Sequence, residues 1–210
     1  MSIQQAYNQW STTYDADRNR TRDLDQAVTR QCLAGLHCQA ILELGCGTGK
    51  NTALYARAGQ SVHALDFSAG MIGRARAKTT ARNVTFSVAD LTKPWPCADR
   101  TADLVACNLV LEHIKNLSFI CSEASRILVE SGLFFVCELH PFRQYAGTQA
   151  SFQHRQQTVA IEAFVHHISD YTAAASAAGL ALTDLREWWH EADHGQPPRL
   201  VSLMFEKAGR

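Results

Sequence analysis

The sequence predicts a doubly wound α/β fold built on a mostly parallel seven-stranded sheet. Short apolar strands alternate with helical patterns between residues 40 and 139, and this alternation is typical of βαβ units with parallel strands. The first strand runs directly into a turn with glycine at every second position, at Gly45, Gly47 and Gly49. A strand that ends in such a turn and then enters a helix indicates a ligand site at the carboxyl end of a parallel sheet.

The expected elements follow each other closely along the chain. Apolar runs predict strands at residues 40–44, 61–65, 84–88, 102–107 and 132–139, and helical periodicity predicts helices at 51–58, 69–80 and 117–129. After these come a helix from Ser169 to Ala178 and two strands, 180–188 and 199–206, which we expect to pair as an antiparallel terminal hairpin at the sheet edge.

Two segments depart from this alternation. Residues 1–36 are first aromatic and polar and then helical, which we interpret as an N-terminal helical lid segment. Polar–apolar alternation within residues 143–168 predicts antiparallel strands outside the main sheet, in a small cap after strand five. The length of 210 residues suits a single domain over 1–210.

Composition narrows the classes of partner. Twenty basic and twenty acidic residues cancel, which argues against nucleic acid or an anionic membrane as the main partner. No apolar run approaches the roughly 18 residues of a membrane span, and the first residues lack a signal-peptide pattern. The seven cysteines are scattered and form no C-x-x-C pair, so we expect free thiols, no metal site and a cytoplasmic location.

Carboxylates stand at or beside the carboxyl ends of the first three strands: Glu43, Asp66 and Asp90. Glu43 would repel a pyrophosphate, and the third glycine comes one residue too early for the dinucleotide fingerprint. Asp66 lies roughly 20 residues beyond the glycine turn, from where an acid reaches ribose hydroxyls. Asp90 could accept from an adenine amine while the Leu91 amide donates to the ring, although an acid after a strand is also a common turn or helix cap. Together the acids favour a positively charged, phosphate-free adenosine compound.

These segments resemble the successive motifs of class I S-adenosylmethionine-dependent methyltransferases of the small-molecule type. The matching segments are 43–49, 66–68, 89–91, 103–108 and 111–114, and the resemblance covers roughly residues 1–140. It implies a Rossmann-like methyltransferase fold with S-adenosyl-L-methionine as cofactor. The cofactor-binding residues that it implies are Tyr14, Glu43, Gly45, Cys46, Gly47, Gly49, Asp66, Phe67, Ser68, Met71, Asp90, Leu91, Asn108 and His113.

The acceptor side is expected in two places. The segment after strand five supplies Glu138, His140, Arg143, Gln144 and Tyr145, and the aromatic leading segment supplies Tyr7 and Trp10. We expect His140 or His113 to act as a catalytic base, and Arg143 could clamp a substrate carboxylate or phosphate. A purely structural alternative is that His140 and Arg143 only pin the cap to the domain, and that His113 is satisfied at a helix start.

The leading hypothesis is a methyltransferase acting on an O, N or S atom of a small-molecule metabolite. A nicotinamide oxidoreductase is disfavoured by the glycine spacing and by Glu43. A protein that binds S-adenosylmethionine without catalysis, as a partner subunit, and a methyltransferase acting on RNA or protein stay open. Trp188 and Trp189 point to opposite faces of one strand, so one is expected in the core and the other is free to line a pocket or a homodimer contact.

Overall fold

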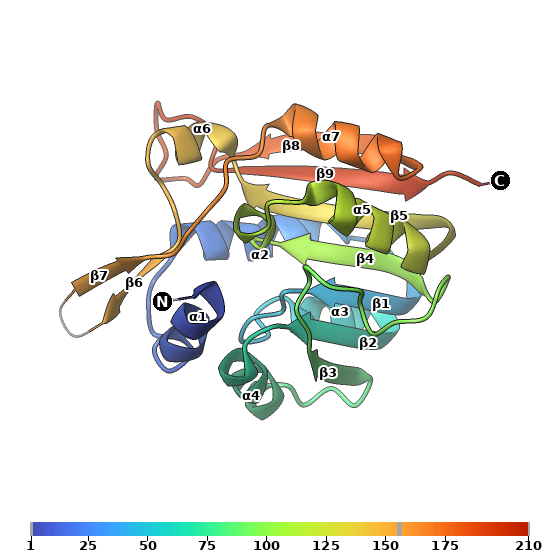
Figure 1. Cartoon of the computed structure of the whole chain (residues 1–210), viewed down its shortest axis with the longest axis horizontal. Helices are drawn as coiled ribbons and strands as arrows, with labels where there is room; N and C mark the ends of the chain where they lie inside the picture. Colours follow the sequence, from blue (N-terminus) through green and yellow to red (C-terminus); the bar gives the residue numbers. More distant parts are fainter. Residues whose placement is uncertain (1, 155–156, 210) are drawn as a thin grey trace.

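Seven strands form one twisted sheet in the computed structural model, which describes residues 2–154 and 157–209 (Figure 1). Their order across the sheet is β3-β2-β1-β4-β5-β9-β8. The first five strands are parallel, and β9 lies antiparallel between β5 and β8. The strands are β1 (Cys38–Leu44), β2 (Gly59–Asp66), β3 (Val84–Val88), β4 (Ala102–Asn108), β5 (Leu128–Leu139), β8 (Leu180–Trp188) and β9 (Leu200–Lys207). The predicted sheet and its antiparallel terminal hairpin are confirmed.

Helices cover both faces of this sheet. The helices are α1 (Ile3–Trp10), α2 (Arg20–Cys32), α3 (Thr52–Ala58), α4 (Ala69–Lys78), the 3₁₀ turn η1 (Leu111–His113), α5 (Leu117–Ile127), α6 (Pro141–Tyr145) and α7 (Ile168–Ala177). Helices α5 and α7 pack on the face nearer the viewer in Figure 1, and α2, α3 and α4 pack on the other face.

Strand alternation explains the two cores. In β1, Ile41 faces the α2–α3 side and Leu42 faces the α5–α7 side. In β4, Leu104 and Val105 divide in the same way. Because successive strand residues point to opposite faces, an apolar run such as 40–44 is what a strand buried on both faces requires.

Two predicted boundaries were wrong, and one helix was not predicted. Strand β5 begins at Leu128 instead of residue 132, because the chain continues in the sheet through Ser131, which has a positive φ of 58°. Helix α7 begins at Ile168, before Ser169, and the carboxylate of Asp170 accepts the His167 amide at 2.8 Å. At the other end of the chain a separate helix, α1, starts at Ile3, where only an aromatic and polar segment was expected.

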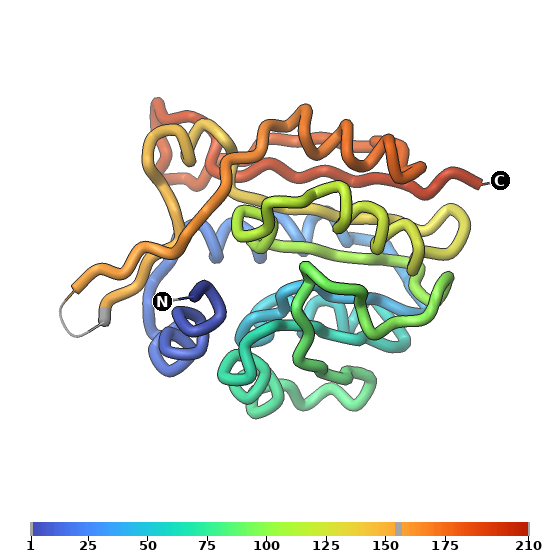
Figure 2. Tube along the Cα trace, viewed as in Figure 1, coloured from blue at the N-terminus to red at the C-terminus, as the bar shows by residue number. Residues whose placement is uncertain are grey.

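The N-terminal helix and a small hairpin lie side by side at the carboxyl ends of the parallel strands (Figure 2). The hairpin consists of β6 (Ser151–His154) and β7 (Gln157–Ala160) in a separate antiparallel pair. The rings of Trp10 and Phe152 stack with centroids 5.4 Å apart, and Ala6 and Ile161 complete this apolar cluster. The cluster is distinct from the two cores of the sheet, so α1 and the hairpin pack on each other as one cover.

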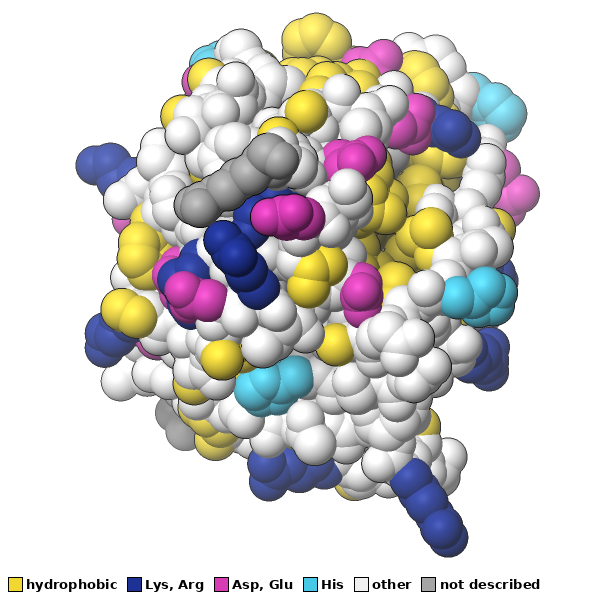
Figure 3. Space-filling view, turned by 90° about the vertical axis from the view of Figure 1, so that its right-hand side faces the viewer, with side chains coloured by type: hydrophobic (Ala, Val, Ile, Leu, Met, Phe, Trp, Pro, Cys, Tyr) yellow, Lys and Arg dark blue, Asp and Glu magenta, His cyan; other side chains and the backbone are white. Residues whose placement is uncertain are grey.

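The opposite end of the molecule carries interspersed charges. Lys, Arg, Asp and Glu side chains alternate over the face in Figure 3, where apolar side chains also line a hollow. Within residues 2–154 and 157–209, each helix is too short or too polar to cross a bilayer. The seven cysteines are all unpaired, and five of them are buried.

Candidate functional site

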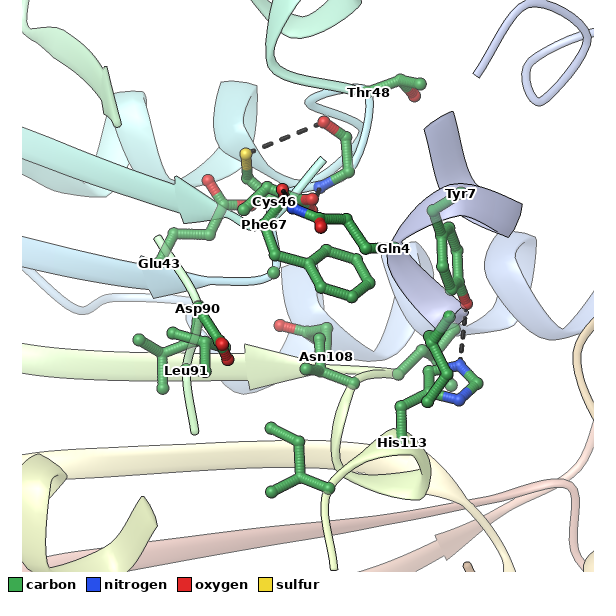
Figure 4. Close-up of a pocket in the computed structure, with 18 of the residues that line it drawn as sticks. Gln4, Tyr7, Glu43, Cys46, Thr48, Phe67, Asp90, Leu91, Asn108 and His113 are labelled. Atoms are coloured by element: carbon green, nitrogen blue, oxygen red, sulfur yellow. Dashed lines mark hydrogen bonds between the residues drawn. The ribbon is translucent and has the colours of Figure 1, made fainter. Parts of the chain in front are cut away.

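A cavity of about 480 Å³ lies at the carboxyl ends of the parallel strands. Its size falls in the range of small-molecule sites. The predicted site residues that line it are Tyr7, Tyr14, Glu43, Gly45, Cys46, Gly47, Asp66, Phe67, Asp90, Leu91, Asn108 and His113. Figure 4 shows Tyr7 and His113 at one end of this cavity and Asp90 with Leu91 at the other. The structure therefore gathers residues from five separate stretches of sequence around one space.

The glycine loop has the backbone that its composition predicts. Gly45, Gly47 and Gly49 all have positive φ, at 66°, 53° and 83°, a conformation that costs residues with a Cβ roughly 1–2 kcal/mol. A Cβ on Gly45 would also collide with the side chain of Val110, whereas the space beside Gly47 is open. The loop thus presents bare backbone to the cavity at two positions for different reasons.

Asp66 is held by the loop that it faces. Its Oδ2 accepts from the Gly47 amide and its Oδ1 from the Ser68 amide, both at 2.8 Å. Each carboxylate oxygen keeps a further lone pair for a ligand hydroxyl. Burial raises the pKa of Asp66 to about 6. Ser68 and Met71 lie outside the lining, where the Ser68 hydroxyl accepts from the Met71 amide and begins α4.

Glu43 is a buried acid with no cation beside it. Thr52 Oγ1 donates to its Oε2 at 2.7 Å. Burial, and secondly the nearby charges of Asp66 and Asp25, raise the pKa of Glu43 to about 8. Neither Glu43 nor Asp66 belongs to an ion pair among the described residues. A nearby cation stabilises the ionised form of a buried carboxyl that has no counter-charge. The Glu43 and Asp66 side chains therefore fit a positively charged adenosine compound.

Asp90 takes part in a turn at the other end of the cavity. Its Oδ1 accepts from the amide and the hydroxyl of Thr92, at 3.0 and 2.6 Å. The residue lines the cavity together with Leu91. Asp90 therefore makes the turn that the sequence offered as an alternative, and it still lies where it could contact an adenine.

A polar network beneath the loop was missed in the sequence. Asn108 donates to Asp25 Oδ1 at 2.7 Å and accepts from the Tyr55 hydroxyl at 2.6 Å. Asn51 donates to the other oxygen of Asp25 at 2.7 Å, and both of these side chains are buried. The side chain of Asn108 is thus occupied by protein partners. Asp25 follows Arg22 by three residues, so both lie on one face of α2. This pair of charged residues was the sequence feature that could have indicated a buried polar network.

Arg22 is the second residue that the sequence did not single out. Its guanidinium lies 4.0 Å from the centre of the Tyr14 ring and donates to the backbone oxygens of Tyr14 and Asp17. The cation is therefore used to fold the segment between α1 and α2 along the cavity wall. Lys50, the other lining cation, pairs with Asp23 at the surface.

Tyr7 and His113 form a hydrogen-bonded pair on the cavity wall (Figure 4). The Tyr7 hydroxyl lies 2.8 Å from His113 Nε2, and His113 Nδ1 lies 2.7 Å from the backbone oxygen of Glu162. A carbonyl only accepts, so Nδ1 carries the hydrogen and the lone pair of Nε2 accepts from Tyr7. Burial lowers the pKa of His113 and raises the pKa of Tyr7. The imidazole is therefore neutral and oriented to take a proton.

The segment after β5 does not reach the cavity, which corrects the expected role of His140. His140 is 1% exposed, its Nε2 contacts Glu187 Oε1 at 2.9 Å, and its Nδ1 accepts from the Phe142 amide at 3.2 Å. Both ring nitrogens are engaged in starting α6 and joining it to β8. This is the pinning role that the sequence left open as an alternative.

The other expected acceptor residues of this segment are also turned to protein partners. Arg143 pairs with Asp193 at 3.1 Å, so it is no free clamp for an anion. Glu138 Oε1 accepts from the amides of Val110 and Leu111, at 2.9 and 3.0 Å. Gln144 donates to the backbone oxygen of Phe164, Tyr145 contacts His167, and Trp10 and Gly49 also lie outside the lining. Proximity in sequence to a strand end did not place these side chains in the cavity.

No group of three or more His, Cys, Asp or Glu side chains within residues 2–154 and 157–209 is arranged to hold a metal ion.

Comparison with known proteins gives a consistent family. A family model described as a methyltransferase domain matches residues 42–136. An uncharacterized methyltransferase of Emericella nidulans is 27% identical, over 97% of this chain and 84% of its own. A demethylmenaquinone methyltransferase of Tropheryma whipplei is 26% identical, over 81% of this chain and 66% of its own.

A solved structure agrees on the fold. The putative S-adenosylmethionine-dependent methyltransferase from Listeria monocytogenes superposes with a TM-score of 0.72 at 18% identity, over 87% of this chain and all of that one. The match extends beyond residues 42–136, so the shared architecture includes parts of the chain outside the family model.

Proposed function

Since the chain is a class I S-adenosylmethionine-dependent methyltransferase, with S-adenosylmethionine as its cofactor, we propose that it methylates a hydroxyl group of a small molecule and that Tyr7 and His113 remove the hydroxyl proton. The observation that carries this proposal is the hydrogen bond from Tyr7 to the free lone pair of a neutral, buried imidazole on the cavity wall.

The residues that would hold the cofactor are those of the acidic half of the cavity. Glu43 and the backbone of Gly45 to Gly47 would hold the methionine portion, Asp66 the ribose, and Asp90 with Leu91 the adenine. The buried, unpaired carboxyls of Glu43 and Asp66 support this assignment, because they suit a ligand with positive charge and hydroxyls. When bound, the cofactor supplies an electrophilic methyl group on a positively charged sulfur.

The charges around the cavity support an acceptor without an anionic group. The lining carboxyl residues are Asp25, Glu43, Asp66, Asp90 and Glu162, against the cations Arg22 and Lys50. Arg22 donates to backbone oxygens, and Lys50 pairs with Asp23. A carboxylate or phosphate on the acceptor would therefore meet like charge without a free counter-ion. A small-molecule acceptor also agrees with the demethylmenaquinone methyltransferase among the relatives.

The proton path follows from the hydrogen bonds. The Tyr7 oxygen has a lone pair available to accept from the hydroxyl of the acceptor while its own hydrogen points to His113 Nε2. As the acceptor oxygen gives up its proton to Tyr7, Tyr7 passes its hydrogen to His113. The Glu162 carbonyl keeps Nδ1 protonated throughout, so the imidazole becomes imidazolium. General-base help of this kind contributes about 10²–10⁴-fold to a rate.

The test is methyl transfer to matched acceptors. Purified protein with S-adenosylmethionine is offered phenols and enols, then the corresponding amines and thiols, and S-adenosylhomocysteine formation is followed with mass spectrometry of the product. We expect hydroxyl methylation that His113→Gln and Tyr7→Phe each lower at least about 100-fold, because the proton path needs both groups. Calorimetry should find cofactor affinity within about threefold of wild type for both variants, a difference below roughly 1 kcal/mol.

His37→Gln is the matched control, because His37 lies outside the cavity lining. Methylation of amines or thiols alone, unaffected by His113→Gln, would contradict the proposal. Cofactor binding without transfer to any of these acceptors would instead favour the non-catalytic partner subunit or an RNA or protein substrate.

A further inference from the structure

A buried carboxyl lies beside the imidazole that the proposed function makes the proton acceptor. Glu112 Oε1 is 3.7 Å from His113 Nε2, and the side chains of Glu112 and His113 are 8% and 7% exposed. The second carboxyl oxygen of Glu112 is buried and has no hydrogen-bond partner. A buried polar oxygen without a partner costs stability, and this carboxyl is therefore free to respond to a charge on the imidazole beside it.

The other titratable groups around His113 are already engaged. Tyr7, from α1, occupies Nε2, and the backbone of Glu162 occupies Nδ1. Glu138, from β5, is tied to the amides of Val110 and Leu111. Tyr171, from α7, contacts the ring of His166, whose Nε2 lies 2.8 Å from the Ile114 oxygen. Glu112 is thus the carboxyl within direct reach of the imidazole nitrogen that receives the proton.

A buried imidazolium is costly without a nearby negative charge. While both Glu112 and His113 are uncharged, neither side chain needs a counter-charge. Once His113 accepts a proton from Tyr7, a positive charge appears on a side chain that is only 7% exposed. Burial raises the pKa of Glu112 to about 7, so this group can be ionised at neutral pH and its charge responds to that of its neighbour.

We propose that Glu112 is a positioning residue whose carboxylate stabilises His113 in its protonated form. The proposal rests on the function proposed above, because it assigns Glu112 to the step in which His113 takes the proton. Glu112 touches neither acceptor nor cofactor: it lies outside the cavity lining and acts through His113.

The direct test is the titration of the His113 ring, followed by NMR of the histidine ring protons between pH 5 and 9 in the full chain. His113→Gln identifies the resonance. We expect Glu112→Gln to weaken proton binding at His113 at least about tenfold, which lowers the midpoint by about one pH unit. Glu191→Gln, the same change at an exposed carboxyl outside the cavity, should leave the midpoint unchanged.

A second variant keeps the test decisive if Glu112→Gln does not fold. Glu112→Asp retains the charge on a shorter side chain, and we expect a midpoint between wild type and the full loss. With a hydroxyl acceptor, Glu112→Gln should also lower kcat about tenfold with an unchanged KM for the cofactor, and should move the pH dependence of kcat.

An unchanged His113 midpoint in both Glu112 variants would overturn the proposal while leaving hydroxyl methylation standing. The titration needs no acceptor, so its outcome is separate from the test of the proposed function. If the wild-type protein methylates no hydroxyl acceptor while Glu112→Gln still lowers the His113 midpoint, the proposed function fails. The contact between Glu112 and His113 would then have no role in catalysis.

Discussion

The backbone amide of Gly47 donates a 2.8 Å hydrogen bond to Asp66, which joins the glycine loop to the tip of β2. The Ser68 amide occupies the other oxygen of the same carboxylate. Two amides therefore fix the orientation of the carboxylate in the ligand-free protein. Such preorganisation reduces the ordering cost of binding, so we expect loop geometry and cofactor affinity to be coupled through Asp66.

We expect Asp66→Ala to weaken S-adenosylmethionine binding about 10–100-fold, because hydrogen bonds to a charged acceptor contribute about 1.5–3 kcal/mol. Isothermal titration calorimetry measures this affinity. Circular dichroism should show a folded protein, since the change is at the edge of the sheet. Asp66→Asn, which keeps the shape and one acceptor, should lie between. An affinity equal to wild type for both variants would contradict the assignment of Asp66 to the ribose.

The stability of the ligand-free protein should fall as pH rises from about 5 to 8. Burial raises the pKa of Glu43 from 4.5 to about 8 and of Asp66 from 3.8 to about 6. Between the unfolded and folded values the native state binds more protons than the unfolded chain, so the free energy of unfolding decreases with pH in this window. Thermal melts across this range measure the effect, and Glu43→Gln should make the slope above pH 6 shallower. Glu112 and Glu138, whose pKa values burial raises to about 7 and about 8, should contribute the remaining slope.

Cofactor affinity should follow the opposite trend. A positively charged ligand favours the ionised carboxyls, so binding should tighten from pH 6 to 8 and release protons. Calorimetry in buffers of different ionisation enthalpy counts those protons. S-adenosylhomocysteine, which lacks the sulfonium charge, is the matched ligand and should show a weaker pH dependence. Equal pH slopes for the two ligands would argue against a carboxylate acting on the sulfonium.

Gly45 and Gly47 should respond differently to alanine. Both have positive φ, but only at Gly45 would the added Cβ meet the Val110 side chain. We expect Gly47→Ala to cost about 1–2 kcal/mol of unfolding free energy from backbone strain, and Gly45→Ala to cost more. Denaturant unfolding measures both.

The double variant Gly45→Ala/Val110→Ala tests the cause. If the collision with Val110 is responsible, the second change should recover part of the loss. If the double variant loses as much unfolding free energy as the two single variants together, backbone strain alone accounts for the effect.

His140→Ala should lower stability and leave cofactor affinity unchanged. The imidazole accepts from the Phe142 amide at the start of α6 and contacts Glu187, and loss of a helix cap costs about 0.5–2 kcal/mol. Chemical denaturation and calorimetry measure the two quantities. Turnover lost at full stability would restore the catalytic role that the sequence suggested for this residue.

Much of the cofactor half of the site was predictable, because it depends on local pattern. An apolar strand, a glycine turn and an acid at the next strand tip are encoded within about 25 residues, and parallel strands bring their carboxyl ends to one edge. Gly45, Asp66 and Asp90 therefore line the cavity as their spacing predicted. Whether they bind the cofactor as assigned is what the variants above measure.

The acceptor half was harder to predict. His140 and Arg143 follow strand β5, and by the same rule they should face the cavity. Helix α6 begins at once and turns both side chains to Glu187 and Asp193 on the terminal hairpin and its loop. A strand-end rule fixes where the backbone leaves the sheet, but the next few dihedral angles and the available partners fix where the side chain points.

The sequence by itself determined the order of the sheet strands along the chain, the strand tips that carry acids, and the turn that needs glycine. These properties depend on residues that are close along the chain. The tertiary structure alone decided that Tyr7 meets His113, 106 residues away, and that Glu112 is buried beside them. Such contacts depend on how α1, η1 and the segment after β7 pack across the ends of the strands, and packing between distant elements leaves no periodic pattern in the sequence.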